Sequence, residues 1–259
     1  MSPSPPTLLK QKHLQYWFRS LRTLLPHDYT SNDSQRMTIA FFILSSLDLL
    51  GSLHPSPLSP STTQPPVTSD ERSSYISWIY LCQHPHGGFR GSPGTLLKSR
   101  QTTTENQHWD HASLAATWFA LLNLILLGDD LSRVDRVAAW RWLRRIQRRR
   151  QSGGDGSFGE VLEAGGNVGG GGDPRFAYFA AGVRWLLRGE EGTGLMGLGL
   201  EDDEQDIDVD GLVGFINSCE VHTSYPGSYG HFQDMTRSDC FRLTMADMGN
   251  RLTGSPTLA

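Results

Sequence analysis

Three side chains that bind metal ions occupy alternate positions in the segment LCQHPHGGF, residues 81–89. Cys82, His84 and His86 supply a thiol and two imidazoles, the ligand types that zinc prefers in proteins. The same segment ends in two glycines before Phe89, a pattern typical of a helix that breaks into a turn. The residue types therefore leave two interpretations open, a metal centre and a structural turn, and the surrounding elements must decide between them.

A second group of candidate ligands lies in HWDH, where His108, Asp110 and His111 precede an apolar helix. No cysteine is near this group, and structural zinc sites usually include one. An aspartate before a helix accepts hydrogen bonds from the unpaired N–H groups of its first turn. We therefore expect Asp110 to cap the following helix rather than to bind a metal.

The basic segment RRIQRRR, residues 144–150, follows Trp140 and Trp142, and arginines near aromatic residues are one signature of nucleic-acid binding. The whole chain has a formal charge of −4, from 23 basic and 27 acidic residues, which argues against general affinity for nucleic acid. Cations in the last turn of a helix also complement its dipole. We therefore expect a solvated helix end here and no nucleic-acid partner.

The composition predicts a reduced, cytoplasmic protein. Its three cysteines are widely spaced, which does not suggest a disulfide framework, and the N-terminal MSPSPPTLLKQKH lacks the apolar centre of a secretion signal. The longest apolar run, residues 114–127, contains Thr117 and Asn123 and is shorter than the ~20 residues that cross a bilayer. We therefore expect a buried helix there and no transmembrane segment.

Helical periodicity dominates the chain, and no stretch alternates as a strand would. Segments with an apolar stripe on one side alternate with segments that are apolar nearly all round. An inner ring of helices inside an outer ring that faces water would produce this alternation. The sequence therefore predicts an all-α fold of the α/α toroid type. The predicted helices cover residues 13–26, 34–51, 70–83, 111–128, 132–147, 173–189 and 206–220.

Two of these helices begin with recognisable capping signals. Ser132 is followed three residues later by Asp135, a version of the capping box, so we expect Ser132 as the N-cap. Asp173 precedes Pro174, and proline is favoured at the first helical position. We expect that helix to begin at Pro174 and to end before Gly189.

An internal repeat decides between the metal centre and the turn. One striped helix ends at Gln83 and leads through glycines to Phe89, and another ends at Gln147 and leads through glycines to Phe158. A looser third copy leads to Tyr229. Glycine permits positive φ at a helix end, and the aromatic side chain then packs back between helices. We therefore interpret residues 82–89 as a repeat turn whose histidines occupy spacer positions.

Stretches rich in proline, serine and glycine divide the chain, because such stretches cannot pack a core. The predicted parts are N-terminal toroid helices at 1–53, a linker at 54–69, further toroid helices at 70–219 with glycine-rich insertions at 161–172 and 189–199, and a tail at 220–259.

Several segments together resemble the β subunits of the protein prenyltransferase family, and within it the geranylgeranyltransferase type I group. They are RMTIAFFILSSLDLLGSL, WIYLCQ followed by GGFRGS, LGDDLSRVDR, DGSF and DPRFAYFAAGVRWLL. The resemblance runs from about Leu14 to Cys219, and residues 220–259 do not share it. It implies an α/α toroid that transfers geranylgeranyl from its diphosphate to the cysteine of CaaX proteins ending in Leu.

The resemblance also implies a zinc cofactor and two protein partners, a prenyltransferase α subunit and the CaaX-box small GTPases. The family's zinc ligands are an Asp-x-Cys pair and a later His, in C-terminal repeats that we do not find here. Asp239 and Cys240 could be compared with this pair, with His222 or His231 as the third ligand. However, Asp239 and Cys240 are adjacent, whereas the family's Asp and Cys are separated by one residue. We therefore expect an incomplete toroid with neither catalytic residues nor zinc ligands, and a truncated chain without activity.

Substrate contacts are implied by the resemblance at Thr38, Phe42, Arg175 and Tyr178. Thr38 stands where farnesyl-transferring relatives keep a bulky Trp, so the pocket would have room for one more isoprene unit. Arg175 and Tyr178 would line the channel for isoprenoid and peptide. The alternatives are a Thr38 bonded to the preceding helical turn, a solvated Arg175 and a core Tyr178.

A second functional hypothesis is a non-catalytic helical module that binds a prenyltransferase α subunit. An incomplete toroid leaves inner-helix surface uncovered, and such apolar surface is typical of an interaction site. Terpene cyclases share α/α barrels, but no DDxxD-type stretch lies at the end of an inner helix here. We therefore set that class aside.

Overall fold

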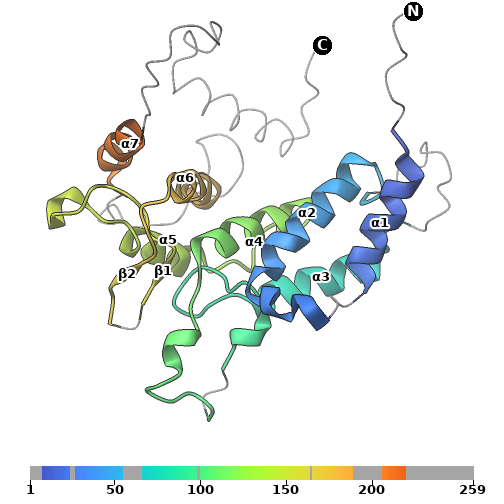
Figure 1. The fold of residues 1–259 in the computed structure, drawn as a ribbon, viewed down its shortest axis with the longest axis horizontal. Helices are drawn as coiled ribbons and strands as arrows, with labels where there is room; N and C mark the ends of the chain where they lie inside the picture. The colour runs from blue at the N-terminus through green and yellow to red at the C-terminus, as the bar shows by residue number, and fades with distance from the viewer. Residues whose placement is uncertain are drawn as a thin grey trace, which may run out of the picture.

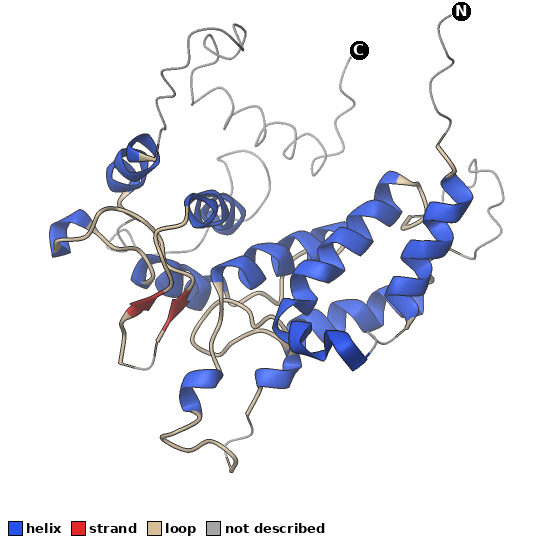
Figure 2. Cartoon of the chain, in the orientation of Figure 1, coloured by secondary structure: helices blue, strands red, loops and turns tan. Residues whose placement is uncertain are grey.

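The structure is a computed structural model that describes residues 8–23, 27–54, 66–97, 100–163, 165–188 and 206–219. Figure 2 shows that helices make up most of this part of the chain, with one small pair of strands. The helices are α1 (Lys10–Arg22), α2 (Arg36–Leu49), α3 (Ser69–Leu81), α4 (Leu114–Leu126), α5 (Arg136–Arg145), α6 (Pro174–Arg188) and α7 (Val209–Ser218). Short 3-10 turns are η1 (His27–Gln35), η2 (Pro93–Thr95), η3 (Gln107–Trp109) and η4 (Arg150–Ser152).

The helices form an inner and an outer series. The inner helices α2, α4 and α6 pack side by side, with α4 between the other two (Figure 1). The outer helices pack against them, α1 on α2, α3 on α4, and α5 and α7 on α6. This arrangement is the one that the alternation of striped and fully apolar segments predicts.

The two inner helices that look fully apolar in the sequence differ in their burial. In α4, most side chains are buried, as expected. In α2, by contrast, Phe42 and Leu49 are 55% and 74% exposed, although the sequence of this helix is apolar nearly all round. Within the described residues, α1 and α4 cover one side of α2, and no helix covers the side that carries these two residues.

Two polar residues interrupt the apolar run of α4, and both join it to other elements. The Thr117 hydroxyl accepts a hydrogen bond from the backbone N–H of Phe89, at 2.9 Å. The Asn123 amide donates to the backbone oxygen of Met37 in α2, at 3.1 Å. Because both residues are fully buried, these bonds fix the position of α4 against the first repeat turn and against α2.

The two repeat turns adopt the same hydrogen-bonding pattern, so the predicted repeat is confirmed for these copies. Gln83 pairs with Phe89 in an antiparallel bridge, and Gln147 pairs with Phe158 in the same way. The backbone N–H of His84 donates to Gly88, as that of Arg148 donates to Ser157. His84 therefore occupies the position that Arg148 occupies in the second copy. The third copy, with Tyr229, lies outside the described residues.

Each turn is joined to the start of the next outer helix through its glutamine. The Gln83 side chain accepts from the backbone N–H of Asp135, the N-cap of α5, at 2.9 Å. The Gln147 side chain accepts from the backbone N–H of Asp208, the N-cap of α7, at 2.7 Å, and donates to its oxygen at 2.8 Å. The same amide link therefore fixes the order of the outer helices twice.

Helix starts agree with the sequence for α6 but not for α5. Helix α6 begins at Pro174, and the carboxylate of Asp173 accepts from the backbone N–H of Arg175 at 2.8 Å, as expected. The expected N-cap Ser132 is wrong, because Asp135 caps α5 instead and accepts from the N–H of Ala138. The backbone of Asp135 is held by Gln83, and this long-range bond decides which of the two candidates starts the helix.

A small β-hairpin occupies part of the predicted glycine-rich insertion at 161–172. Strands β1 (Val161–Leu162) and β2 (Val168–Gly169) pair antiparallel, a feature that the all-α prediction did not include. They are too short to alternate visibly in the sequence, and Ser113 and Glu160 fix β1 beside the start of α4. Residues 55–65, 189–205 and 220–259 of the other predicted divisions lie outside the described part.

The last residues of the predicted linker, Thr68 and Ser69, form the start of α3. Thr68 caps α3, and Glu71 completes the capping box by accepting from the N–H of Thr68 at 2.9 Å. Among the described residues, no helix has both the length and the apolar character needed to cross a membrane.

Candidate functional site

The inner helices bring their aromatic side chains into one continuous row. Phe41 and Phe42 of α2 contact Phe119 of α4, with ring centroids 5.0 and 6.3 Å apart. Phe119 in turn meets Phe179 of α6 edge to face at 5.5 Å. Attractive aromatic pairs have centroids about 4.5–7 Å apart, so these contacts stabilise the row. We call the row and its extension the aromatic wall, which consists of Phe41, Phe42, Trp118, Phe119, Phe176, Tyr178 and Phe179.

The end of the aromatic wall on α6 rests on a buried tryptophan. Tyr178 lies 5.9 Å from Phe179 and stacks edge to face on Trp118 at 5.6 Å. Trp118 is 1% exposed, whereas Tyr178 is 37% exposed. Partial burial raises the pKa of the Tyr178 hydroxyl above its ordinary value, so this group is neutral at physiological pH. The wall therefore has no charge of its own.

Part of the aromatic wall is uncovered in the described structure. Phe42 and Tyr178 expose more than a third of their surface, and Leu49 lies further along the exposed side of α2. Contiguous exposed apolar side chains are typical of a binding surface. Since the Tyr178 hydroxyl is the wall's single oxygen-bearing side-chain group, the wall is suited to an apolar ligand selected by shape.

The structure brings together two of the four expected substrate-binding residues. Phe42 and Tyr178 both belong to the aromatic wall and are joined through Phe119 and Phe179. Thr38 is half-buried one turn before Phe42 on α2. The roles expected for these residues stay predictions.

Arg175, the fourth expected residue, does not join the aromatic wall through any contact described. Its side chain is 79% exposed and forms an ion pair with Asp173, with Nη2 and Oδ2 2.6 Å apart. The hydrogen bonds from Arg175 hold the pKa of the Asp173 carboxyl below its ordinary value. Its position one turn before Tyr178 leaves the exposed guanidinium near the end of the wall.

Sequence reasoning missed Phe119 and Phe179, which connect the wall. The signal that could have found Phe119 is the internal repeat. Phe42 stands nine residues before Gly51, and Phe119 stands nine residues before Gly128, with both glycines in the left-handed conformation at their helix ends. Equivalent positions of neighbouring inner helices lie side by side, so this spacing predicts the contact.

Comparison with known proteins identifies the fold family. The prenyltransferase alpha-alpha toroid domain matches residues 8–235. The chain belongs to this family. A solved structure, Candida albicans protein geranylgeranyltransferase-I complexed with GGPP, matches with a TM-score of 0.58 and 23% identity over 82% of this chain and 51% of that chain. The predicted α/α toroid is therefore confirmed.

Relatives of this toroid chain include two β subunits of geranylgeranyl transferase type 1. The Arabidopsis thaliana protein is 26% identical over 229 residues, which are 85% of this chain and 50% of that protein. The Dictyostelium discoideum protein is 27% identical over 238 residues, 85% of this chain and 56% of that protein. The protein farnesyltransferase β subunit of Pyricularia oryzae is 27% identical over 184 residues, which are 70% of this chain and 28% of that protein. The chain spans about half the length of the geranylgeranyl transferase relatives.

Within the toroid, the segment with Cys82 and His84 is a structural turn. The Cys82 thiol is fully buried and donates to the backbone oxygen of Trp78, and burial raises its pKa to about 12. The His84 Nδ1 accepts from the backbone N–H of His86, at 3.1 Å. Burial above all, and then the charge of Arg90, lower the pKa of His84 to about 4. Both side chains are therefore neutral at physiological pH, and their hydrogen bonds to the backbone stabilise the turn.

The neutral, partly buried state of His84 predicts a pH-dependent stability. An unfolded chain protonates this imidazole near pH 6.5, whereas the folded chain resists protonation down to about pH 4. The unfolded state therefore binds the extra proton between these values, and stability falls as pH falls, by at most about 1.4 kcal/mol per pH unit. Urea unfolding at pH 7.0, 6.0 and 5.0 gives the free energy of unfolding, which should fall less steeply with pH in His84→Gln than in the original chain. The same fall in both proteins would contradict the prediction.

Asp110, the candidate metal ligand that we expected to cap α4, has a different partner. The predicted N-cap Asp110 is wrong, because Ser113 caps α4 and accepts from the N–H of Ala116 at 3.1 Å. Asp110 instead binds the guanidinium of Arg90 through both carboxylate oxygens. In the described part of the toroid, no three His, Cys, Asp or Glu side chains come together as a metal site. His222, His231, Asp239 and Cys240 lie outside the described residues.

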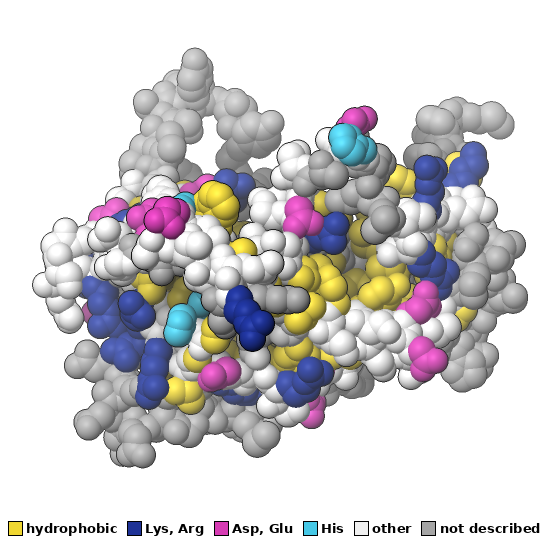
Figure 3. Space-filling view, turned by 90° about the horizontal axis from the view of Figure 1, so that it is seen from below, with side chains coloured by type: hydrophobic (Ala, Val, Ile, Leu, Met, Phe, Trp, Pro, Cys, Tyr) yellow, Lys and Arg dark blue, Asp and Glu magenta, His cyan; other side chains and the backbone are white. Residues whose placement is uncertain are grey.

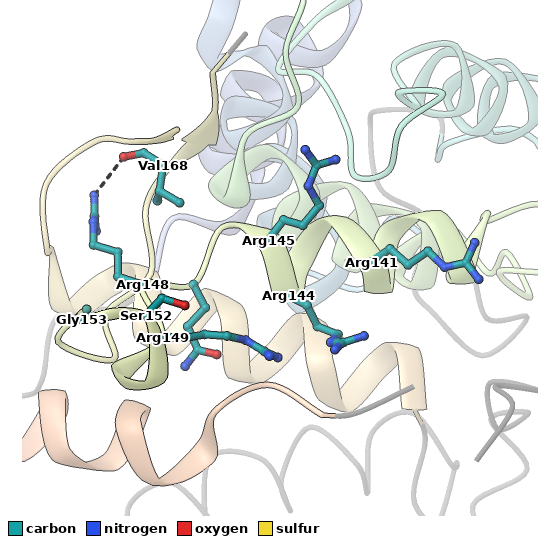
Figure 4. Close-up of a pocket in the computed structure, with 10 residues that line it drawn as sticks. Arg141, Arg144, Arg145, Arg148, Arg149, Ser152, Gly153 and Val168 are labelled. Carbon is teal, nitrogen blue, oxygen red and sulfur yellow. Dashed lines mark hydrogen bonds between the residues drawn. The ribbon is translucent and has the colours of Figure 1, made fainter. Parts of the chain in front are cut away.

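The basic end of α5 differs from the expected solvated helix end. Side chains from residues 141–149 line a cavity of about 780 Å³ between α5, the turn after it and β2 (Figure 4). Trp140 and Trp142, which suggested stacking on nucleic-acid bases, are 0% and 4% exposed and belong to the core. The expectation of no nucleic-acid partner stays a prediction.

Proposed function

We propose that this chain supplies the isoprenoid-binding wall of a protein geranylgeranyltransferase type I β subunit. The observation that carries the proposal is the continuous aromatic wall across α2, α4 and α6, which is partly open in the described structure. Two relatives of the chain, which are β subunits of geranylgeranyl transferase type 1, also support the proposal.

A polyisoprenoid is a suitable ligand for this surface. The chain of a prenyl group carries double bonds and methyl groups and no hydrogen-bonding atoms, and the aromatic wall likewise offers rings and almost no polar atoms. Burial of apolar surface contributes about 25 cal/mol per Å², so a long lipid gains affinity with each isoprene unit that it places on the wall. The wall would thus position the lipid and exclude water from it.

Length selection is assigned to Thr38 in this proposal. Thr38 is half-buried one helical turn before Phe42, at one edge of the wall. A small side chain at this edge leaves space for the last isoprene unit of a geranylgeranyl group, whereas an indole would fill that space. The lipid is then chosen by shape, as expected for a ligand without polar groups.

The remaining parts of the function belong to the same proposal. We propose that the full activity transfers geranylgeranyl to the cysteine of CaaX proteins ending in Leu, among them small GTPases, in the cytoplasm and together with an α subunit. Zinc would activate the acceptor thiol in this family. The described residues offer no cluster that fits zinc, so we assign no catalytic step to them.

Replacing Thr38 by tryptophan tests the assignment. We expect Thr38→Trp to weaken binding of geranylgeranyl diphosphate by about 10- to 100-fold, because the indole takes the space of the last isoprene unit. Binding of farnesyl diphosphate should change less than threefold. Isothermal titration of the chain co-expressed with an α subunit, with each diphosphate in turn, measures both values.

A control variant separates shape from general damage to the fold. Thr38→Ser keeps the hydroxyl and a small volume, so it should bind both diphosphates like the original chain. The proposal fails if Thr38→Trp weakens both diphosphates equally, or if the original chain binds neither of them.

The alternative function is a non-catalytic module that binds an α subunit through its uncovered inner surface. The 74% exposure of Leu49 and the 55% exposure of Phe42 favour it, because a soluble protein normally covers such side chains. A chain that forms a defined complex with the α subunit in the titration above, yet binds neither diphosphate, would support this alternative.

A further inference from the structure

The cavity at the basic end of α5 is lined by five arginine side chains. It measures about 780 Å³, which is within the range of small-molecule sites. Among the described residues, its lining contains no aspartate or glutamate. The lining residues are Arg141, Arg144, Arg145, Gln147, Arg148, Arg149, Ser152, Gly153, Gly154 and Val168.

Two of these arginines have buried donors that no described group satisfies. The Nε atoms of Arg144 and Arg149 are both inaccessible to solvent and have no hydrogen-bond partner. Figure 4 shows the two guanidinium groups pointing into the same space between α5 and the turn that follows it. Buried unpaired N–H groups and neighbouring like charges are both unfavourable, so an anion in this space would stabilise the arrangement.

The arginines are held in place by the fold. The guanidinium of Arg148 donates to Ser157 Oγ at 3.1 Å and to backbone oxygens of the hairpin, those of Val168 and Gly170. Arg149 donates through Nη2 to the backbone oxygen of Asp206, at 2.8 Å. These hydrogen bonds use neutral acceptors, so they orient the two side chains without forming an ion pair; the charge of Arg148 also acts on the nearby carboxyl of Asp155, whose pKa it helps to lower.

Two carboxylates beside Arg149 already have cationic partners. The carboxylate of Asp206 binds the guanidinium groups of both Arg184 and Arg188, which share its Oδ2 atom. Asp208 caps α7 and pairs with Arg150, at 3.4 Å. These acids therefore do not neutralise Arg144 and Arg149.

We propose that this cavity is a binding site for a small molecule that carries several phosphate groups. A guanidinium presents two parallel N–H groups to a phosphate, and several guanidiniums around one cavity match several phosphates. A ligand with a single carboxylate would offer one anionic group to a cavity whose lining includes both Arg144 and Arg149. The space-filling view shows one group of Lys and Arg side chains at one end of the molecule, with others spread over the rest of this face (Figure 3). This site is independent of the proposed prenyl function.

Titration with inorganic tripolyphosphate and with inositol hexakisphosphate tests the site in the full chain. We expect one ligand per chain for the original protein, and binding at least tenfold weaker for the double variant Arg144→Gln/Arg149→Gln. Affinity should also fall steeply as the salt concentration rises, because the interaction is largely ionic. Arg144→Lys/Arg149→Lys keeps the charges but loses the paired N–H groups. Its affinity for both phosphates should lie between those of the original protein and the double glutamine variant.

The matched control is Arg19→Gln, which removes a charge from the exposed surface of α1. It should bind both phosphates like the original chain, and a rise in melting temperature on adding tripolyphosphate should occur in this variant but not in the double glutamine variant. The proposal is wrong if the original chain binds neither phosphate, or if Arg19→Gln weakens binding as much as the double variant.

Flotation with lipid vesicles distinguishes a soluble ligand from a lipid headgroup. Vesicles of phosphatidylcholine with and without a phosphoinositide are compared at the same salt concentration. Binding to free inositol hexakisphosphate without retention on the vesicles would support the soluble ligand. Retention on the phosphoinositide vesicles without binding of either free phosphate would overturn it. Thr38→Trp should leave phosphate binding unchanged, so failure of the prenyl proposal and failure of this one are separate results.

Discussion

Replacing Asp110 by alanine is expected to lower the free energy of unfolding by about 3 kcal/mol. Its partner Arg90 is 1% exposed and would keep its charge in the interior without a carboxylate. The bond from Arg90 to the backbone oxygen of Gln83, at 2.8 Å, remains but cannot neutralise that charge. Urea unfolding followed by circular dichroism measures the loss.

A double variant and an exposed ion pair serve as controls for Asp110. Arg90→Met/Asp110→Ala removes the stranded charge as well, so we expect it to recover part of the stability lost in the single variant. Arg36 pairs with Asp33 near the surface, where their side chains are about 40% exposed, and Arg36→Ala should cost less than about 1 kcal/mol. A loss of that small size for Asp110→Ala would contradict the prediction.

The second large effect is expected at two glycines that occupy the same place in the two repeat turns. Gly87 and Gly156 have φ of +102° and +87°, where other residues are strained. A Cβ on Gly87 would overlap the backbone oxygen of Ala138 in α5, and one on Gly156 would overlap that of Gly211 in α7. We expect Gly87→Ala and Gly156→Ala each to lower the free energy of unfolding by about 2–5 kcal/mol.

Two other glycines separate backbone strain from the close approach. Gly153 also has positive φ, but a Cβ there meets nothing within 4 Å, so Gly153→Ala should cost only about 1–2 kcal/mol. Gly214 lies within α7 with open space around it, and Gly214→Ala should stabilise the helix by up to about 1 kcal/mol. Thermal and urea unfolding compare the four variants. Equal losses for Gly87→Ala and Gly153→Ala would show that the packing contact is unimportant.

The sequence predicts the helices and their nesting well because both depend on local apolar periodicity. The stripe of α1 buries Leu14 and Phe18, and the apolar run of α4 is buried, as expected. Periodicity cannot show which apolar faces are covered, however. Phe42 and Leu49 are as apolar as their buried neighbours, and their exposure depends on where other helices lie.

Helix starts were harder to predict where two candidates stand close together. Asp110 and Ser113 both precede α4, and a carboxylate is as good a cap as a hydroxyl. Arg90, twenty residues away, binds Asp110 and leaves Ser113 to cap the helix. Such competition between a local and a distant partner is invisible in a single segment. At the start of α5 the distant partner acts differently, because Gln83 binds the backbone of Asp135, the residue that caps the helix.

The candidate site was predictable in part, through repetition and resemblance. Phe42 and Tyr178 were expected at the site, and the structure places them in one aromatic wall. The cavity lined by Arg144 and Arg149 was not expected, because its shape arises from α5, the turn after it and β2 together. The arginines themselves are obvious in the sequence, but their convergence on one space is a property of the fold.

The link between a glutamine and the next N-cap has a consequence for how such chains acquire new features. Gln83 and Phe89 enclose residues 84–88, whereas Gln147 and Phe158 enclose residues 148–157, a stretch twice as long. Both stretches begin and end on the same backbone bonds and keep a glycine two residues before the aromatic residue, so the residues between can differ in number and type while the helices keep their places. One stretch contributes arginines to a cavity, and the other contributes a partly buried histidine.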